Sequence, residues 1–300
     1  MPDCVLALDV GGTSVKLALT GGDGQPLSGT TGQLDFQSDG TQDEILNAFR
    51  AAASSGLRMA GEYGCTLSGC GIAFPGPFDF MEGISHMDHK MLAIKDVPLT
   101  PVFAHVLGDI PIRYLHDSSA YLLGEALSGA AKDAASPACV MLGTGLGFAY
   151  MHNGRVRVGH DQRPHAVLWN APYQNGTAED YVSRRAIRER FAKTAGLIKP
   201  PDVKEIAGLA LKGDRAAIDT FRETGELLAC ILRPWLKHLN CDLLIIGGQI
   251  ARSAELFIHT VQAGLPLPVR AAMHLNDAAL RGAARYCVLP HGKLVEEVER

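Results

Sequence analysis

The sequence has no long apolar run. A membrane-spanning helix needs roughly 18 consecutive apolar residues, and no segment of the 300-residue chain approaches that length. The amino-terminal segment MPDCVLALDV also lacks the basic region and the cleavage site of a secretion signal. We therefore expect a cytoplasmic protein that has no membrane as a partner.

Long blocks of like charge are absent as well. The formal net charge is only -4, and acidic and basic residues are interspersed along the chain. A surface for nucleic acid or for an anionic membrane is therefore not expected. The content of 47% hydrophobic and 20% charged residues is typical of a compact globular protein, for which small molecules are the expected ligands.

No C-x-x-C pair occurs among the seven cysteines, which are Cys4, Cys65, Cys70, Cys139, Cys230, Cys241 and Cys287. Cys65 and Cys70 are close enough in sequence to contact one metal ion, but no matching group of histidines or cysteines lies near them. Most of the cysteines stand singly among apolar or small residues. This pattern predicts ordinary core residues in a reducing compartment.

A glycine turn joins the first two predicted strands. Residues 4–8 are almost wholly apolar, as in a buried strand, and apolar residues alternate along 15–20. The turn between them contains Gly11, Gly12 and Thr13, and such turns expose backbone N–H groups that can hold phosphate oxygens. It matches neither the G-K-[ST] phosphate loop nor the G-x-G-x-x-G dinucleotide motif, because a strand follows it.

The second half of the chain repeats this plan. After a change of composition at 130–138, a strand leads into a turn with Gly143, Thr144 and Gly145, and a second strand follows. Either turn by itself can be explained as a tight hairpin. Two matched turns in two matched halves favour a shared phosphate-binding function.

Asp9 ends the first strand, next to the glycine turn. A carboxylate beside phosphates is repelled unless a cation lies between them. Asp9 is therefore predicted to hold Mg²⁺, directly or through water. In the alternative interpretation, Asp9 belongs only to the hairpin.

His116 and Asp117 lie where a predicted strand at 110–115 meets a predicted helix at 118–129. A carboxylate that is hydrogen-bonded to an acceptor hydroxyl orients it and accepts its proton, which suits Asp117 to phosphoryl transfer. Asp117 is equally suited to cap the helix, and the two roles can coexist.

Together these segments resemble the ROK family of the sugar kinase, Hsp70 and actin superfamily, along nearly the whole chain. DVGGTSVKLAL resembles the first phosphate motif, FPGPFD the sugar-side loop and HDSSAYLLGE the catalytic segment. LGTGLG is similar to the second phosphate motif and LLIIGGQIA to the adenosine motif. The order and spacing of the five segments carry the resemblance.

The resemblance implies an actin-like, ribonuclease H-like α/β fold of two duplicated βββαβαβα-type lobes with a central cleft. The amino-terminal lobe is expected at 1–117, completed by a carboxyl-terminal helix at about 286–300 by the same likeness. The second lobe is expected at 118–285. A homodimer is also expected.

The resemblance assigns roles to individual residues as well. Asp117 is expected to be the general base on the 6-hydroxyl of a sugar, and Gly247 and Gly248 are expected to pass close to adenosine. Around the phosphates and Mg²⁺ we expect Asp9, Gly11, Gly12, Thr13, Lys16, Gly143, Thr144 and Gly145. In contact with the sugar we expect Gly76, Pro77, His116, Asp117, His160 and Glu179.

Glu179 and His160 also have plainer interpretations. Glu179 would complement the dipole of a helix capped by Thr177, and His160 would be an ordinary surface histidine. The family's structural zinc site combines a G-H histidine with a cysteine cluster, whereas residues 161–180 contain no cysteine after Gly159-His160. We therefore expect no structural zinc.

Two further departures concern the sugar. His116 stands where the family has asparagine, and residues 86–99 lack an expected asparagine. Because discrimination between sugars rests on pairing each hydroxyl, these changes are expected to alter the preferred sugar. His86, His89 and Lys90 either supply replacement contacts or belong to a solvated loop.

The expected activity is ATP-dependent phosphorylation of a hexose or hexose derivative, glucokinase-like, with Mg²⁺ as cofactor. Glucose and amino or N-acylated hexoses are the first candidates, and polyphosphate is an alternative donor. A sugar-responsive regulator would carry a DNA-binding extension, and only eight residues precede Asp9 here. A noncatalytic sugar-binding relative is the remaining alternative.

Overall fold

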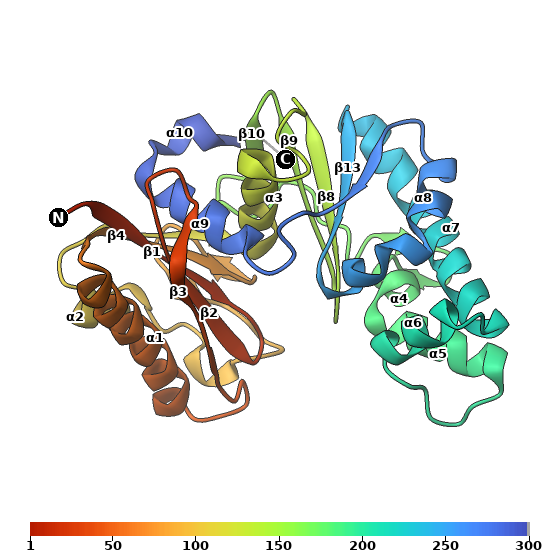
Figure 1. Cartoon of the computed structure of the whole chain (residues 1–300), viewed down its shortest axis with the longest axis horizontal. Coiled ribbons are helices and arrows are strands. Elements are labelled where there is room, and N and C mark those ends of the chain that lie inside the picture. The colour runs from red at the N-terminus through yellow and green to blue at the C-terminus, as the bar shows by residue number, and fades with distance from the viewer. Residues whose placement is uncertain (299–300) are drawn as a thin grey trace. The chain divides into compact units, whose positions relative to one another are not determined.

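The computed structural model describes residues 1–298 and divides into two compact units (Figure 1). The first unit combines Met1–Ser128 and Arg155–His165 with the chain from Asn276 onward. The second unit contains Gly129–Gly154 and Ala166–Leu275.

A five-stranded sheet in the order β3-β2-β1-β4-β7 forms the centre of the first unit. β1 pairs antiparallel with β2 and parallel with β4, and β4 pairs parallel with β7. The strands are β1 (Asp3–Val10), β2 (Ser14–Thr20), β3 (Pro26–Asp35), β4 (Thr66–Phe74) and β7 (Ile112–His116). The short elements of this unit are β5 (Phe78–Asp79), β6 (Ile84–Ser85), η1 (Leu92–Ile94), β10 (Arg155–Val158), α10 (His291–Leu294) and β15 (Val295–Glu297), the last pairing parallel with β10.

Alternate residues of β1 face two different helical layers, as the period of two in a strand requires. Leu6 and Leu8 lie in the core beneath α1 (Gln42–Tyr63) and α2 (Thr100–Leu107). Val5 and Ala7 pack instead against Leu280 of α9 (Ala278–Val288). The almost continuous apolar sequence of β1 follows from this burial on both faces.

A capping box formed by Thr41 and Glu44 starts α1. Glu44 N donates to Thr41 Oγ1 at 3.3 Å, and Thr41 N donates to Glu44 Oε2 at 2.7 Å. The helix does not end at Gly56 but continues to Tyr63. Gly56 is instead a contact position, because a Cβ there would overlap the side chain of Leu6.

The unit boundaries differ from those expected at residues 117 and 286. α3 (Asp117–Ser128) packs so closely against α9 that a Cβ on Gly282 would overlap the backbone of Ala120. Gly124 meets the backbone of Ala278 in the same way. Because this packing binds both helices to the first unit, its segments end at Ser128 and resume at Asn276.

We expect Gly282→Ala to destabilise the protein by about 2 kcal/mol or more, because the added methyl group has no room between the two helices. The matched control is Gly208→Ala in α6 (Val203–Leu211), where no atom lies within 4 Å of an added Cβ. That substitution is expected to stabilise by up to about 1 kcal/mol. Urea unfolding of both variants measures the difference, and equal midpoints would contradict the close α3–α9 packing.

The second unit repeats the core of the first. Its strands lie in the order β14-β13-β8-β9, with β8 antiparallel to β9 and parallel to β13. This matches the pairing of β1 with β2 and β4, so the predicted duplication is confirmed. The strands are β8 (Pro137–Leu142), β9 (Leu146–His152), β13 (Leu243–Gly247) and β14 (Val269–Ala271), with the hairpin β11 (Pro172–Tyr173) and β12 (Gly176–Thr177).

Helices complete the second unit. Its apolar core joins the sheet to Phe191, Phe221 and Leu228, among others. The longest helix runs without interruption through Pro234. The helices are α4 (Glu179–Val182), α5 (Arg184–Ala195), α6, α7 (Arg215–His238), η2 (Gln249–Leu256) and α8 (Ile258–Gly264).

One cysteine expectation is wrong. Cys4 and Cys65 form a disulfide bond rather than two separate thiols. The parallel pairing of β1 with β4 places Cys4 opposite Leu67, so the chain entering β4 passes beside the start of β1. Sequence spacing alone does not show this neighbourhood. Cys70, Cys139 and Cys287 are buried and are not part of a disulfide bond, as expected.

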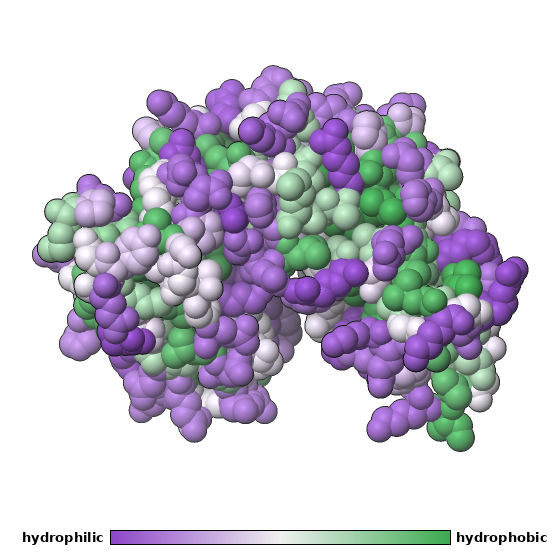
Figure 2. Space-filling view, viewed as in Figure 1, coloured by the Kyte–Doolittle hydropathy of each residue, from purple (hydrophilic) through white to green (hydrophobic). Residues whose placement is uncertain are grey.

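Hydrophilic and hydrophobic residues are mixed on the visible surface (Figure 2). Some apolar side chains of the second unit are well exposed, among them Ile198 and Leu211. Within residues 1–298, no helix has the length and apolar character that crossing a membrane requires.

Candidate active site

In the first unit, the carboxyl ends of three parallel strands meet at one edge of the sheet. Asp9 of β1 lies opposite Ala73 of β4, and Phe74 lies opposite His116 of β7. The segments that follow these strands are the Gly11 turn, the Gly76-Pro77 loop and Asp117. Ligands of α/β proteins bind at this edge of a parallel sheet. The structure thus places Asp9, the Gly11 turn, the Gly76-Pro77 loop, His116 and Asp117 at one edge of this sheet.

The β1–β2 turn is tight and open to solvent. Gly11 N donates to Ser14 O at 2.8 Å, which closes the turn. A Cβ on Gly12 would meet no atom within 4 Å, and Thr13 is exposed. The backbone here is therefore accessible to a ligand such as phosphate.

Asp9 and Lys16 are cross-strand neighbours at the base of this turn. Asp9 Oδ2 lies 3.9 Å from Lys16 Nζ. Burial raises the pKa of Asp9 from 3.8 to about 6; Lys16 lowers it, and the negative charge of Asp117 raises it further. Asp9 thus lies near a second carboxylate, and Lys16 offsets the effects of burial and of that charge on Asp9 only in part, which suits a divalent cation.

Asp117 stands at the first turn of α3. Its Oδ1 accepts from Ser118 N at 2.6 Å and lies 2.9 Å from His116 Nδ1. Burial raises the pKa of Asp117, but the charge and hydrogen bond of His116, together with Lys90 and the Ser118 N–H, outweigh it and lower the pKa overall. The carboxylate is therefore ionised at neutral pH, and it bonds the helix terminus while staying able to accept a proton.

The imidazole of His116 is held on several sides. Nδ1 lies 2.8 Å from Ser118 Oγ, and the ring centroid lies 5.7 Å from that of Phe80. Gly76, which precedes the cis peptide bond to Pro77, faces the other nitrogen, because a Cβ there would lie 3.3 Å from Nε2. The expected sugar-side loop thus contacts the residue next to the predicted base.

In the second unit, Glu179 supports the β8–β9 turn. Leu146 N donates to Glu179 Oε2 at 2.8 Å, and a Cβ on Gly145 would lie 2.7 Å from the same oxygen. Gly143 N donates to Gly145 O at 3.1 Å, and Thr144 is exposed. Sequence reasoning missed this contact, because nothing in the spacing shows that residue 179 returns to residue 145.

The helix-cap interpretation of Glu179 fits the structure only in part. Glu179 is the first residue of α4, but Ala178 precedes it as the cap residue. The hydroxyl of Thr177 donates to Asp180 Oδ2 at 2.8 Å instead. The predicted contact of Glu179 with sugar stays a prediction.

Gly247 ends β13 and Gly248 follows it, at the same edge as the β8–β9 turn. Gly247 lies opposite Met141 of β8. Gly248 has φ +81 and packs so closely that a Cβ would overlap the backbone of Leu142. This contact explains the glycine without a ligand, and proximity to adenosine stays a prediction.

His160 hydrogen-bonds near the chain terminus rather than to the predicted base. Its Nδ1 lies 3.0 Å from Glu297 Oε2, and Glu297 Oε1 accepts from Gln162 Nε2 at 2.6 Å. The side chain of His160 is largely exposed. Residues 1–298 contain no group of three or more His, Cys, Asp or Glu residues arranged to hold a metal ion.

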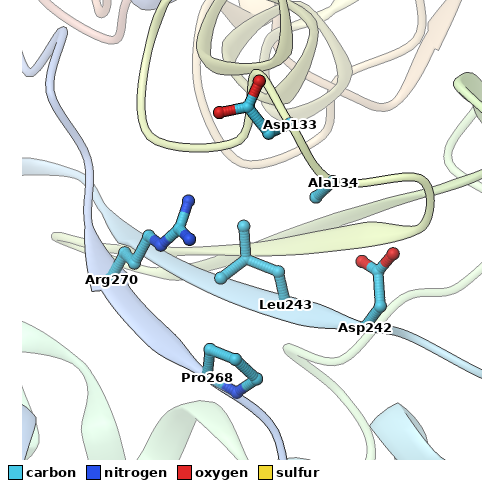
Figure 3. A pocket seen from close by; sticks show the side chains of 6 residues that line it. All are labelled: Asp133, Ala134, Asp242, Leu243, Pro268 and Arg270. Carbon is cyan, nitrogen blue, oxygen red and sulfur yellow. The ribbon is translucent and has the colours of Figure 1, made fainter.

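A small cavity of about 170 Å³ lies in the second unit, between Asp133, Ala134, Asp242, Leu243, Pro268 and Arg270 (Figure 3). It sits at the amino end of β13, opposite to the glycine segments. The carboxylate of Asp242 accepts from Ala135 N and Ser136 N, and Arg270 donates to Ala130 O. These charges hold backbone segments, and the cavity lies apart from the candidate site.

The family model that describes the ROK family matches residues 5–287. A glucokinase of Thermotoga maritima is 28% identical over 84% of this chain and 84% of its own length. An N-acetylmannosamine kinase of Escherichia coli O157:H7 is 24% identical over 93% of this chain and 96% of its own length. The transcriptional repressor Mlc of Escherichia coli K12 is also 24% identical, over 73% of this chain and 60% of its own length.

A solved structure shows the same fold. The ROK family glucokinase of Streptomyces griseus, in complex with glucose and AMPPNP, has a TM-score of 0.76 at 22% identity. The match covers 95% of this chain and 99% of that one. The expected actin-like α/β fold is confirmed.

Proposed function

Because this chain belongs to the ROK family, we propose that it is a sugar kinase that transfers the γ-phosphoryl group of ATP to the 6-hydroxyl of a hexose or hexose derivative. One observation carries the proposal. An open glycine turn, a partly buried Asp9 and an ionised Asp117 lie at the carboxyl edge of one sheet. Glucokinases and N-acetylmannosamine kinases among the relatives support the reaction class.

In the proposed reaction, Asp117 accepts the proton of the sugar hydroxyl as it attacks phosphorus. The carboxylate is prepared for this because His116 and the Ser118 N–H hold Oδ1 in place. Its second oxygen, Oδ2, is then available to the substrate hydroxyl. Such a general base contributes roughly 10²- to 10⁴-fold to a rate.

Each unit contributes a glycine turn that is proposed to bind phosphate. In the first unit the proposed contacts are the backbone of Gly11 to Thr13 and the ammonium group of Lys16. The Gly143 to Gly145 turn of the second unit, supported by Glu179, is the second proposed phosphate contact. Asp9 would hold Mg²⁺, which supplies charge neutralisation at the phosphates. Its position near a second carboxylate fits that ion.

The acceptor sugar is proposed to lie against Gly76, Pro77 and His116, with Glu179 and His160 as further candidates. Glucose and amino or N-acylated hexoses are the first substrates to test. Polyphosphate is the donor to compare with ATP. We further propose a cytoplasmic homodimer.

Coupled ADP release across a panel of hexoses tests the proposal, with the sugar-binding affinity of each measured in parallel by calorimetry. Sugar-dependent ADP release on at least one hexose is the expected result. Binding without turnover would instead identify a noncatalytic sugar-binding protein, a role that the repressor among the relatives makes worth testing. Absence of both would overturn the proposal.

A further inference from the structure

Lys90 differs from the charged residues around it in its burial and in its nearness to Asp117. The side chain is half-buried, and no hydrogen bond or ion pair connects it to any of residues 1–298. Burial lowers the pKa of Lys90, whereas the negative charge of nearby Asp117 raises it. A partly desolvated ammonium group needs acceptors for its three N–H donors, and a ligand oxygen in the site can replace water in that role.

The segment that carries Lys90 is firmly anchored. Met87 and Met91, on either side, are completely buried. Met91 N donates to Ser38 O at 3.0 Å, and Asp96 N donates to Ser85 O at 2.7 Å. These contacts hold in place the backbone that carries Lys90.

The same segment is tied to the proposed sugar side of the site. His86 N donates to Pro77 O at 3.0 Å, next to Gly76, which faces His116. Lys16, in contrast, pairs with Asp9 beside the glycine turn. The two lysines therefore lie beside different segments, Lys16 beside the glycine turn and Lys90 on the segment bonded to the Pro77 loop.

The other candidates of this segment are already engaged or exposed. His86 Nδ1 lies 2.7 Å from Asp96 Oδ1, and His89 Nδ1 lies 3.2 Å from Asp88 Oδ1. Lys95 is exposed. Lys90 alone among these residues combines partial burial, unused donors and proximity to Asp117.

Building on the proposed sugar kinase function, we infer that Lys90 is a specificity-determining residue whose ammonium group donates a hydrogen bond to an oxygen substituent of the acceptor sugar at Asp117. A lysine offers donors and no acceptor, so it selects an oxygen that accepts. Charge-assisted hydrogen bonds of this kind are stronger than neutral ones. The preferred sugar therefore carries an accepting oxygen within reach of both Lys90 and Asp117.

The test is a comparison of the best hexose with its monodeoxy analogues, on the wild type and on Lys90→Met. In the wild type, removing the oxygen that Lys90 contacts should raise KM roughly 10- to 100-fold. Lys90→Met should raise KM for the parent sugar by a similar factor, with kcat changing far less. In Lys90→Met, the KM for the same deoxy analogue should be little higher than the KM for the parent sugar. Lys90→Arg should recover part of the affinity.

Lys95→Met is the matched control, because it makes the same change on an exposed residue of the same segment, and it should behave as the wild type. Equal losses on every analogue, an unchanged KM in Lys90→Met, or a fall in kcat alone would each overturn the inference. If the wild type binds a sugar without turnover, the kinase proposal fails. The same comparison, made with dissociation constants, then tests whether Lys90 contacts the sugar oxygen. If no sugar binds, both fail.

Discussion

Asp117→Asn is expected to lower kcat by roughly 10²- to 10⁴-fold while leaving the fold intact. An asparagine oxygen can still accept the Ser118 N–H that Asp117 Oδ1 accepts at 2.6 Å, so the start of α3 is preserved. The amide cannot take the proton of a substrate hydroxyl. ADP release under saturating sugar and ATP measures the loss, and sugar affinity by calorimetry should change much less.

The lowered pKa of Asp117 gives this experiment a second readout. Because the carboxylate is ionised well below neutrality, protonation of Asp117 should not limit the wild-type rate between about pH 6 and 8. Asp109→Asn, which neutralises an exposed carboxylate, is the control and should retain full activity. An Asp117→Asn variant with more than a tenth of wild-type turnover would remove Asp117 from the role of base.

Asp9→Asn is expected to lower turnover by at least about 100-fold and, at the same time, to make the protein more stable. The loss of turnover follows from removal of the proposed Mg²⁺ ligand. The gain in stability follows from the raised pKa of Asp9, since folding brings a carboxylate into a site that disfavours its charge. Function and stability thus oppose each other at this residue.

The raised pKa of Asp9 makes the stability of the wild type depend on pH. The folded state holds the proton of Asp9 up to a pKa of about 6, against an ordinary value of 3.8, so wild-type stability falls as pH rises between these values. The stability of Asp9→Asn should not fall in this way, because asparagine does not titrate. Without Mg²⁺, it should be about 1–3 kcal/mol more stable at pH 8 and equal to the wild type near pH 4.

Urea unfolding at both pH values, with and without Mg²⁺ and ATP, measures the effect. Added Mg²⁺ and nucleotide should stabilise the wild type more than the variant, because they bind the native state through Asp9. Asp23→Asn, a change in an exposed turn, is the control and should show neither the loss of turnover nor the gain at pH 8. A variant less stable than the wild type at pH 8 would contradict the electrostatic account.

Local features of this protein follow from the sequence because they depend on neighbours along the chain. The two predicted strand-turn-strand repeats are confirmed by the structure. The strand-to-helix junction at Asp117 is confirmed as well. Each involves residues a few positions apart, whose backbone geometry and hydrogen bonds are set locally.

The unit boundaries and several partners depend on contacts between distant segments. Gly282 and Gly124 allow α9 and α3 to approach closely, and this assigns both helices to the first unit. Glu179 reaches the turn at Gly145, and Glu297 reaches His160. No periodicity or spacing shows which surfaces meet in this way, because packing decides it.

The sequence by itself determined the duplicated α/β plan, the two glycine turns and the acids beside strand ends, because strand period, turn chemistry and motif order are written along the chain. Only the tertiary structure decided that Asp9 and Asp117 influence each other's charge and that Cys4 meets Cys65. It also showed that His86 and His89 are paired with aspartates of their own segment, whereas Lys90 lies near Asp117. The reason is physical, since burial and electrostatic coupling depend on distances through space, which the folded sheet sets.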